Sequence, residues 1–317
     1  QLAGEGARRR FEQAGDLHLY DPRNGTTKRL EITARGDFPW LVPQWKEVTG
    51  RIAAAAISPT GKRVAIEARG DIFSVPAEKG DWRAVTASSG SAERTPAWSP
   101  DGRWLSWFSD ATGEYQLMIA PQDGSGTPRA VALPDPTFYY TPVWSPDSKK
   151  ILLTDTHLRL WVVDVATGKA TNADTDQYMV PTRSMDPRWS PDSRWIAYTK
   201  RLRTQLHAVF VYDTQTGKVT QMTDGMADVI SPAWDANGRW LYFLGSTSFA
   251  LQTGWLDMTS YEHSATRSLY VALLRAGDKS PLLPESDEET VVDASAPRPA
   301  APAAPGTPGA APAAPAP

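Results

Sequence analysis

Short apolar segments, each entered through a polar turn, recur along the chain at a nearly constant interval. They combine aromatic and β-branched residues and occupy Trp104–Phe108, Ile151–Thr154, Trp195–Thr199 and Trp240–Leu244. Runs of this length and composition predict β-strands that are buried in a sheet. Further along each copy a second apolar segment predicts another strand, and these lie at Asp71–Val75, Gln116–Ile119, Leu158–Asp164, Ala208–Asp213 and Ser268–Leu273.

The polar turn before Trp104–Phe108 and before each equivalent segment is itself a repeated motif, Trp-Ser-Pro-Asp-Gly. Its copies begin at Trp98, Trp144 and Trp189 and, in altered form, at Ile57 and Trp234. Proline presets φ, aspartate tolerates the turn conformation, and glycine adopts a positive φ without strain. Ser148 and Ser193 replace the glycine in two copies. We expect the turn there to be slightly strained or of another type.

The copies return at intervals that identify the repeat. Anchored on the proline position, they fall at Pro59, Pro100, Pro146, Pro191 and Ala236, at spacings of 41, 46, 45 and 45 residues. This period is typical of a four-stranded propeller blade and is too long for ankyrin or tetratricopeptide repeats. We therefore predict an all-β fold, a β-propeller of four-stranded blades with about six blades visible, as part of a seven-bladed ring.

One repeat position holds a tryptophan in four copies, at Trp98, Trp144, Trp189 and Trp234. These side chains could pack between adjacent sheets, or they could stack against a ligand. Packing is by far the more common role for a large aromatic residue at a fixed place in a repeat. We therefore predict that the tryptophans are wedges between neighbouring sheets.

The repeat divides the chain into a propeller at 1–290 and a Pro/Ala-rich linker or tail at 291–317. The predicted blade segments are 7–34, 52–90, 94–133, 140–173, 185–223 and 229–284. The first segment contains the second, third and fourth strands of a blade whose first strand is missing. The last has an insertion, Ser246–Thr266, between its second and third strands. Since the chain begins within a blade, we expect that part of the ring was cut away or that an outer strand completes it from elsewhere. Because the chain also lacks a starting Met, we expect it to be excised from a longer protein or processed.

The end of the chain has a composition unlike the rest. Residues 294–317 contain 8 Pro and 11 Ala, with no aromatic residue and no aliphatic residue larger than Ala. Such a segment cannot bury enough apolar surface to offset its ordering entropy. We predict a disordered tail with partial polyproline II character.

Charge and cysteine content narrow the classes of function. The chain has 33 Lys and Arg against 36 Asp and Glu, a net charge of −3, so no basic excess exists to hold nucleic acid. Its longest apolar runs are far shorter than the roughly 20 residues that cross a bilayer, so we predict no membrane partner. The absence of cysteine rules out disulfides, thiol nucleophiles and thiolate metal sites.

The residues offer no self-contained catalytic set. The histidines are His18, His157, His207 and His263. None stands with a serine in a Gly-x-Ser-x-Gly motif, and we interpret all four as structural or surface residues. The string Gly124-Ser-Gly lies between predicted strands, where its glycines serve a turn rather than a phosphate cradle.

Two acidic segments have an alternative interpretation as sites. Asn172, Asp174 and Asp176 alternate like the first ligands of a calcium loop, but the required glycine and glutamate are replaced by Gln177 and Arg183. A solvated turn is the better interpretation. The cluster at 285–289 is better explained as a solvated segment than as an acid–base pair. We therefore predict no catalytic, cofactor-binding or metal-binding residue in this chain.

Four further segments, outside the repeated turn motif, resemble those of a known family. They are Asp16-Leu-His-Leu-Tyr-Asp, Glu67-Ala-Arg-Gly-Asp, Ser109-Asp-Ala-Thr-Gly-Glu-Tyr and Ser280-Pro-Leu-Leu-Pro-Glu-Ser-Asp. Together with the repeat, over residues 10–290, they resemble the second propeller of the tricorn protease family. The Trp-Ser-Pro-Asp motif alone is weak, since it also occurs in TolB and in prolyl-oligopeptidase-like propellers, whereas the combination is specific.

The resemblance implies a function for a parent protein. In this family a six-bladed and a seven-bladed propeller precede a PDZ-like domain and a serine-peptidase core. It implies a cytoplasmic serine peptidase that degrades short peptides, with its catalytic domain absent from this chain. The propeller would then gate substrates and products and contribute to assembly. Its partners would be peptides in the channel and the PDZ-like and peptidase domains of the parent.

Other interpretations remain open at this point. The chain could be a TolB-like protein-interaction propeller without an attached enzyme, or the propeller of another hydrolase such as an amidohydrolase. A periplasmic or secreted location is the alternative to the cytoplasm, and a homo-oligomer is open. The gene sequence downstream of Pro317 would discriminate between these interpretations.

Overall fold

The structure is a computed structural model that describes residues 9–13, 15–33, 35–42, 44–88, 90–177, 185–248, 266–284 and 287. In this part the regular structure is β-strand, apart from two short 3-10 helices, Pro39–Leu41 and Thr49–Arg51. No helix of the described part is long and apolar enough to cross a membrane. The predicted tail and most of the insertion at Ser246–Thr266 lie outside the described residues.

The described strands form six antiparallel sheets, which we number I to VI in chain order. Sheet I contains β1 (Arg9–Gln13), β2 (Asp16–Asp21) and β3 (Thr26–Arg29). Sheet II contains β4 (Ile52–Ile57), β5 (Arg63–Ala68), β6 (Asp71–Pro76) and β7 (Arg83–Ala84). Sheet III contains β8 (Glu93–Trp98), β9 (Trp104–Ser109), β10 (Gln116–Pro121) and β11 (Arg129–Val131).

The second half of the chain repeats this arrangement. Sheet IV contains β12 (Val143–Trp144), β13 (Lys150–Thr154), β14 (Arg159–Asp164) and β15 (Ala170–Thr175). Sheet V contains β16 (Arg188–Trp189), β17 (Trp195–Arg201), β18 (His207–Asp213) and β19 (Val219–Gln221). Sheet VI contains β20 (Asp228–Trp234), β21 (Trp240–Ser246) and β22 (Ser268–Leu273).

Within each sheet the strands are hydrogen-bonded in chain order, as in a propeller blade. The predicted all-β fold is confirmed. The apolar segments predicted as strands form the second and third strands of the sheets. Among the described residues, sheet I has three strands.

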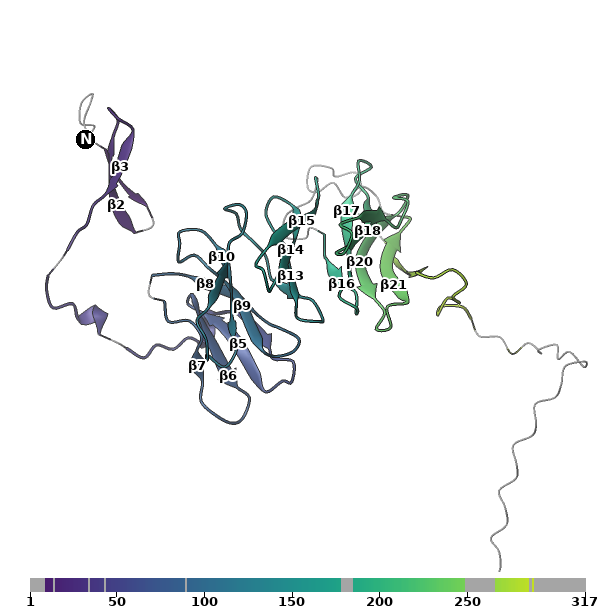
Figure 1. Ribbon diagram of the computed structural model, residues 1–317, viewed down its shortest axis with the longest axis horizontal. Helices are drawn as coiled ribbons and strands as arrows, with labels where there is room; N and C mark the ends of the chain where they lie inside the picture. The colour runs from purple at the N-terminus through teal and green to yellow at the C-terminus, as the bar shows by residue number, and fades with distance from the viewer. Residues whose placement is uncertain are drawn as a thin grey trace, which may run out of the picture. The chain divides into compact units, whose positions relative to one another are not determined.

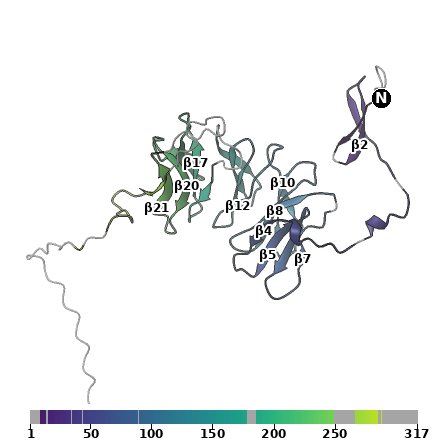
Figure 2. The same cartoon turned by 180° about the vertical axis from the view of Figure 1, so that it is seen from behind.

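Neighbouring sheets pack face to face. Among the described residues, four apolar cores join sheets II to III, III to IV, IV to V and V to VI, and Figures 1 and 2 show these five sheets in chain order. In β13, Ile151 and Leu153 enter the core shared with sheet III, whereas Leu152 enters the core shared with sheet V. Because successive side chains point to opposite faces, a strand buried on both faces needs an uninterrupted apolar run.

The Trp-Ser-Pro-Asp turn is held by its own side chains. The hydroxyl of Ser99 donates to Oδ1 of Asp101 at 2.6 Å and accepts the backbone N–H of Trp104 at 2.9 Å. The backbone N–H of Gly102 donates to the Ser99 carbonyl at 2.9 Å and closes the turn. The next two copies make the same side-chain bonds. The motif therefore fixes how the first two strands of a sheet meet.

Ser148 and Ser193 take the place of glycine without changing the turn. Their φ angles are 59° and 61°, close to the 71° of Gly102, so of the two expectations the slightly strained turn is observed and the other turn type is not. The hydroxyl of Ser148 accepts the backbone N–H of Asp101 at 3.1 Å, in the turn of the preceding sheet. Ser193 accepts the N–H of Asp147 at 3.0 Å in the same way. This bond between sheets, which glycine cannot make, offsets the cost of a left-handed backbone.

Candidate functional site: a groove along the repeated tryptophans

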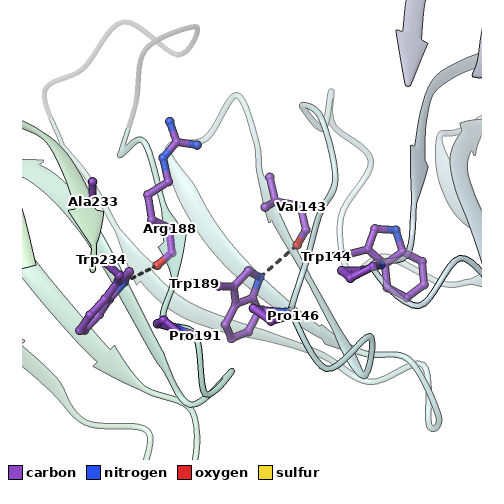
Figure 3. Close-up of a pocket in the computed structure, with 9 residues that line it drawn as sticks. Val143, Trp144, Pro146, Arg188, Trp189, Pro191, Ala233 and Trp234 are labelled. Atoms are coloured by element: carbon purple, nitrogen blue, oxygen red, sulfur yellow. Dashed lines mark hydrogen bonds between the residues drawn. The ribbon is translucent and has the colours of Figure 1, made fainter. Parts of the chain in front are cut away.

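A groove runs across the first strands of sheets IV, V and VI at their turn ends. It has a volume of about 600 Å³. Its lining residues are Pro100, Val143, Trp144, Pro146, Arg188, Trp189, Pro191, Ala233 and Trp234. Each of the three sheets contributes its tryptophan and the residue before it, and Figure 3 shows the three tryptophans in a row. We refer to this surface as the tryptophan groove.

The indole N–H groups in the groove bond to the preceding sheet. Trp189 donates to the backbone carbonyl of Val143 at 3.1 Å, and Trp234 donates to that of Arg188 at 3.0 Å (Figure 3). A carbonyl oxygen has two lone pairs, so it can accept this bond in addition to one from its own sheet. Trp189 and Trp234 thus each tie the first strand of their sheet to the first strand of the preceding sheet.

Two further copies show how regular this bond is. Trp98 makes it to the carbonyl of Ala56 at 3.0 Å. Trp144 instead donates to the hydroxyl of Ser106 at 2.9 Å, and that hydroxyl lies 3.4 Å from the carbonyl of Ala97. A serine therefore relays the bond where the indole does not reach the carbonyl directly.

The tryptophans are packing residues, which confirms the prediction. The exposed fractions of Trp144 and Trp189 are 7% and 9%, and both belong to the apolar cores between sheets. Trp98 and Trp234 are half-buried and pack against the two other cores. Because the indole N–H groups are already bonded, the tryptophans offer the groove apolar surface only.

Arg188 carries the only charge among the described residues that line the groove. Its Nη2 lies 2.8 Å from Oδ1 of Asp186, and these side chains are 54% and 38% exposed. In Figure 3 the side chain of Arg188 extends away from Pro191, which places its guanidinium at the rim. The groove thus combines an apolar floor with one guanidinium at its edge.

Sequence analysis does not single out Arg188. The position before each tryptophan holds Ala97, Val143, Arg188 and Ala233, although the residues that follow are nearly the same in every copy. A position that varies inside a repeated motif is not committed to the packing that the motif maintains. This contrast is the signal that could have identified the residue.

Buried carboxylates lie at the other end of the sheets. Glu93, 3% exposed, accepts the indole N–H of Trp107 at 2.7 Å. Asp155, fully buried, accepts the indole N–H of Trp161 at 2.9 Å and pairs with Nε of Arg159 at 2.7 Å. A buried carboxylate needs such donors to offset the loss of water. These groups are therefore engaged in holding the structure.

Asp228 joins sheets V and VI through two side chains, His207 and Arg267. Its Oδ1 lies 2.6 Å from Nδ1 of His207, and its Oδ2 lies 2.9 Å from Nη2 of Arg267. Burial raises the pKa of Asp228, but the hydrogen bonds from His207 and Arg267 outweigh it and lower the pKa to about 2. The carboxylate is therefore charged in the folded protein at neutral pH.

Arg94 sits among aromatic rings where sheet III meets the segment before sheet IV. Its guanidinium carbon lies 4.6 Å from the ring centre of Phe108, 4.1 Å from Tyr115 and 3.9 Å from Phe138. Its Nη1 donates to the carbonyl of Tyr139 at 2.8 Å. Burial lowers the pKa of Arg94. The cation is thus stabilised largely by ring faces.

Of the four histidines, three lie in the described residues. His18 stacks on Phe11 with ring centres 5.2 Å apart. His157 is exposed, and His207 is bonded to Asp228 as described above. His263 lies outside the described residues.

Residues 172–176 belong to an outer strand and its end, so the prediction of a solvated turn is wrong. Asp174, in β15, accepts the hydroxyl of Tyr198 at 2.6 Å and Nζ of Lys200 at 2.9 Å. Burial and this hydrogen bond raise the pKa of Tyr198. Within the described part of the chain, no three acidic or histidine side chains could hold a metal ion together. Of the cluster at 285–289, only Asp287 is described, and it is exposed.

Four-stranded antiparallel sheets that pack in series and are tied by a repeated tryptophan define this chain as a β-propeller. The comparison with protein families specifies the kind. The model of the tricorn protease second β-propeller domain matches residues 52–302, and the chain belongs to this family.

Relatives and a solved structure agree with this assignment. The tricorn protease homolog of Saccharolobus solfataricus is 28% identical over 77% of this chain and 22% of its own length. Tricorn protease homolog 1 of Streptomyces coelicolor is 26% identical over 78% of this chain and 23% of its own length. The crystal structure of the tricorn protease, 19% identical, matches 90% of this chain and 28% of that chain with a TM-score of 0.56, which shows the shared fold. The chain thus spans less than a third of each of these proteins.

Proposed function

We propose that this chain is the non-catalytic propeller module of a tricorn-like serine peptidase that degrades short peptides. In this proposal the module gates the passage of substrates and products and contributes to assembly, and its partners are peptides and the PDZ-like and peptidase domains of the parent. The main support is the family match over residues 52–302. The relatives named above carry the word protease in their names.

The construction of the first strands supports a gating role. A surface that selects peptides by size must be rigid, because a deformable surface would admit larger peptides. The tryptophan bonds tie each first strand to the preceding sheet, and the serine hydroxyls of Ser148 and Ser193 tie the turns. Residues between these ties, such as Val143 and Ala233, remain accessible in the groove.

The first test concerns the isolated chain. We expect it to hydrolyse fluorogenic tri- to pentapeptides no faster than buffer does, because its sequence contains no cysteine and no histidine in a nucleophile motif. Sustained turnover by pure protein, abolished by a serine-directed inhibitor, would contradict the proposal.

The second test concerns gating and uses the full-length parent protein. Ala233→Trp narrows the tryptophan groove, and Lys79→Trp places the same bulk on an exposed turn outside it. We expect Ala233→Trp to lower kcat/KM severalfold for a pentapeptide and much less for a dipeptide, with little effect from Lys79→Trp. Equal losses for both substrates would show that this wall does not act as a gate.

A further inference from the structure

We propose that the tryptophan groove binds short extended peptides that carry a carboxylate, and that Arg188 is the residue that sets this preference. The inference rests on the proposed function, since it names the class of peptide that the wall would favour. It is carried by the lining of the groove, by the bonds that already occupy its polar groups and by the position of the single guanidinium.

The groove presents one accessible side chain per sheet in a repeated setting. Val143, Arg188 and Ala233 occupy the same place before their tryptophans, and each is half-buried or exposed. An extended peptide lying across the three sheets would meet them in turn. Because their surroundings repeat, discrimination must come from these three side chains, and only Arg188 differs in charge.

The floor of the groove suits an extended chain with apolar side chains. It consists of indole and proline surface, and the indole N–H groups donate to Ser106 and to the carbonyls of Val143 and Arg188. Grooves lined by aromatic residues favour extended or polyproline II peptides, which present side chains without internal hydrogen bonds. The indole N–H groups, being engaged already, cannot select a polar ligand.

The guanidinium at the rim supplies the missing polar recognition. Arg188 makes one ion pair, to Asp186, and both side chains are substantially exposed. Exposed ion pairs contribute little to stability, so Arg188 can share or exchange this partner at small cost. A guanidinium has five N–H donors in a planar fork that matches a carboxylate. The Arg188 backbone is held in place by the bond from Trp234, so the fork starts from a fixed point.

A carboxylate can come from an acidic side chain or from a free C-terminus, and three peptides separate these sources. The first is acetyl-Ala-Val-Glu-Val-Ala-amide, the second has Gln in place of Glu, and the third is acetyl-Ala-Val-Ala-Val-Ala with a free C-terminus. Binding to the 317-residue chain is measured by calorimetric titration. We expect at least one carboxylate peptide to bind about tenfold more tightly than the Gln peptide, since charged hydrogen bonds are the stronger ones.

Arg188→Gln should abolish this preference and leave the affinity for the Gln peptide within about twofold, because only the carboxylate contact is removed. Arg103→Gln is the matched control: Arg103 also lies beside an aspartate, Asp101, at 3.8 Å, and its side chain is 80% exposed outside the groove. This control should keep the preference. Unchanged thermal unfolding of both variants shows that they are folded.

The outcomes divide clearly. A carboxylate preference that disappears in Arg188→Gln and persists in Arg103→Gln supports the inference, and the arm that shows it identifies the source. Equal binding of the three peptides, a preference that survives in Arg188→Gln, or no binding at all overturns it. None of these results decides the proposed gating role, which the Ala233→Trp experiment tests separately in the full-length protein.

Discussion

At the turn end of the sheets, successive copies make the same bonds, whereas at the opposite end each pair of sheets is joined by different residues. The turn end repeats a Ser–Asp hydrogen bond at 2.6, 2.6 and 2.5 Å in three successive copies. It also repeats the indole bond to the preceding sheet in three copies. Because these bonds involve residues of the repeated motif, they would join any two neighbouring blades that carry it.

The opposite end is specific to each junction. Sheets II and III are joined where the backbone N–H of Thr95 donates to Oε2 of Glu67 at 2.8 Å, and sheets III and IV meet around Arg94 and its rings. Sheets V and VI meet at Asp228 with its two partners, His207 and Arg267. Buried polar groups with different partners penalise wrong pairings, because a mismatch leaves a buried charge without a partner. The comparison indicates that one end supplies cohesion and the other supplies the order of the blades.

Removing a wedge should have the largest effect. Trp189→Ala empties a buried aromatic site between sheets IV and V, and we expect a loss of about 3–5 kcal/mol in the free energy of unfolding. Stability in repeat folds depends on interfaces between neighbours, so the loss should be felt beyond sheet V. Denaturant unfolding measures it.

Two further variants sharpen this test. Trp189→Phe keeps the ring but loses the N–H bond to Val143, and it should cost about 1 kcal/mol beyond the smaller area of the ring. Trp82→Ala removes a tryptophan that is 55% exposed, and it should cost much less than Trp189→Ala. If Trp189→Ala unfolds within about 1 kcal/mol of wild type, the tryptophan is not a filled core site.

Removing the charge of Asp228, at the end of the sheets opposite the turns, should cause the next largest loss of stability. Asp228→Asn leaves His207 and Arg267 without their negative partner, and we expect a loss of about 2–4 kcal/mol at pH 7. The folded pKa of about 2 lies below the ordinary value of 3.8, so the charged form stabilises the fold above this range. That contribution is lost as the pH falls from 3.8 towards 2.

The pH dependence therefore distinguishes the charge from mere packing. The difference in unfolding free energy between wild type and Asp228→Asn should narrow as urea titrations are moved from pH 7 to pH 3. A difference that stays constant over this interval would show that the charge of Asp228 does not contribute.

The turn end can be probed more gently at Ser193. Ser193→Ala loses the bond to Asp147 and keeps a side chain at a φ of 61°, so we expect a loss of about 1–2 kcal/mol. Ser193→Gly loses the same bond but relieves the strained backbone, so it should lie closer to wild type. An alanine variant as stable as the glycine variant would show that positive φ carries no cost here.

The smallest effect on stability is expected on the face of a sheet that has no described neighbour. In sheet VI, Leu269 and Leu273 pair with Leu244 and Trp240 and are 52% and 41% exposed. We expect this apolar face to make the isolated chain self-associate. The double variant Leu269→Ser, Leu273→Ser should reduce association in sedimentation velocity and change unfolding by less than about 0.5 kcal/mol. Association that is unchanged would assign it to another surface.

The sequence by itself determined the features that depend on neighbouring residues. The strands at Trp104–Phe108 and Trp195–Thr199 follow from aromatic and β-branched runs, and the turns follow from Ser-Pro-Asp with a residue of positive φ. The spacing of the copies gave the blade and, with a few longer motifs, the family. These signals depend on the order and spacing of residues along the chain, so they can be recognised from the sequence alone.

Only the tertiary structure decided which distant residues meet. The hydroxyl of Ser148 binds a backbone N–H that lies 47 positions earlier, and His207 and Asp228 are 21 positions apart. The period places Ser148 and Asp101 in neighbouring copies but does not show that the two turns touch, because each distance depends on how two sheets pack. For the same reason, Arg188 was an unremarked residue before a tryptophan until the packing of three sheets placed it beside an apolar groove.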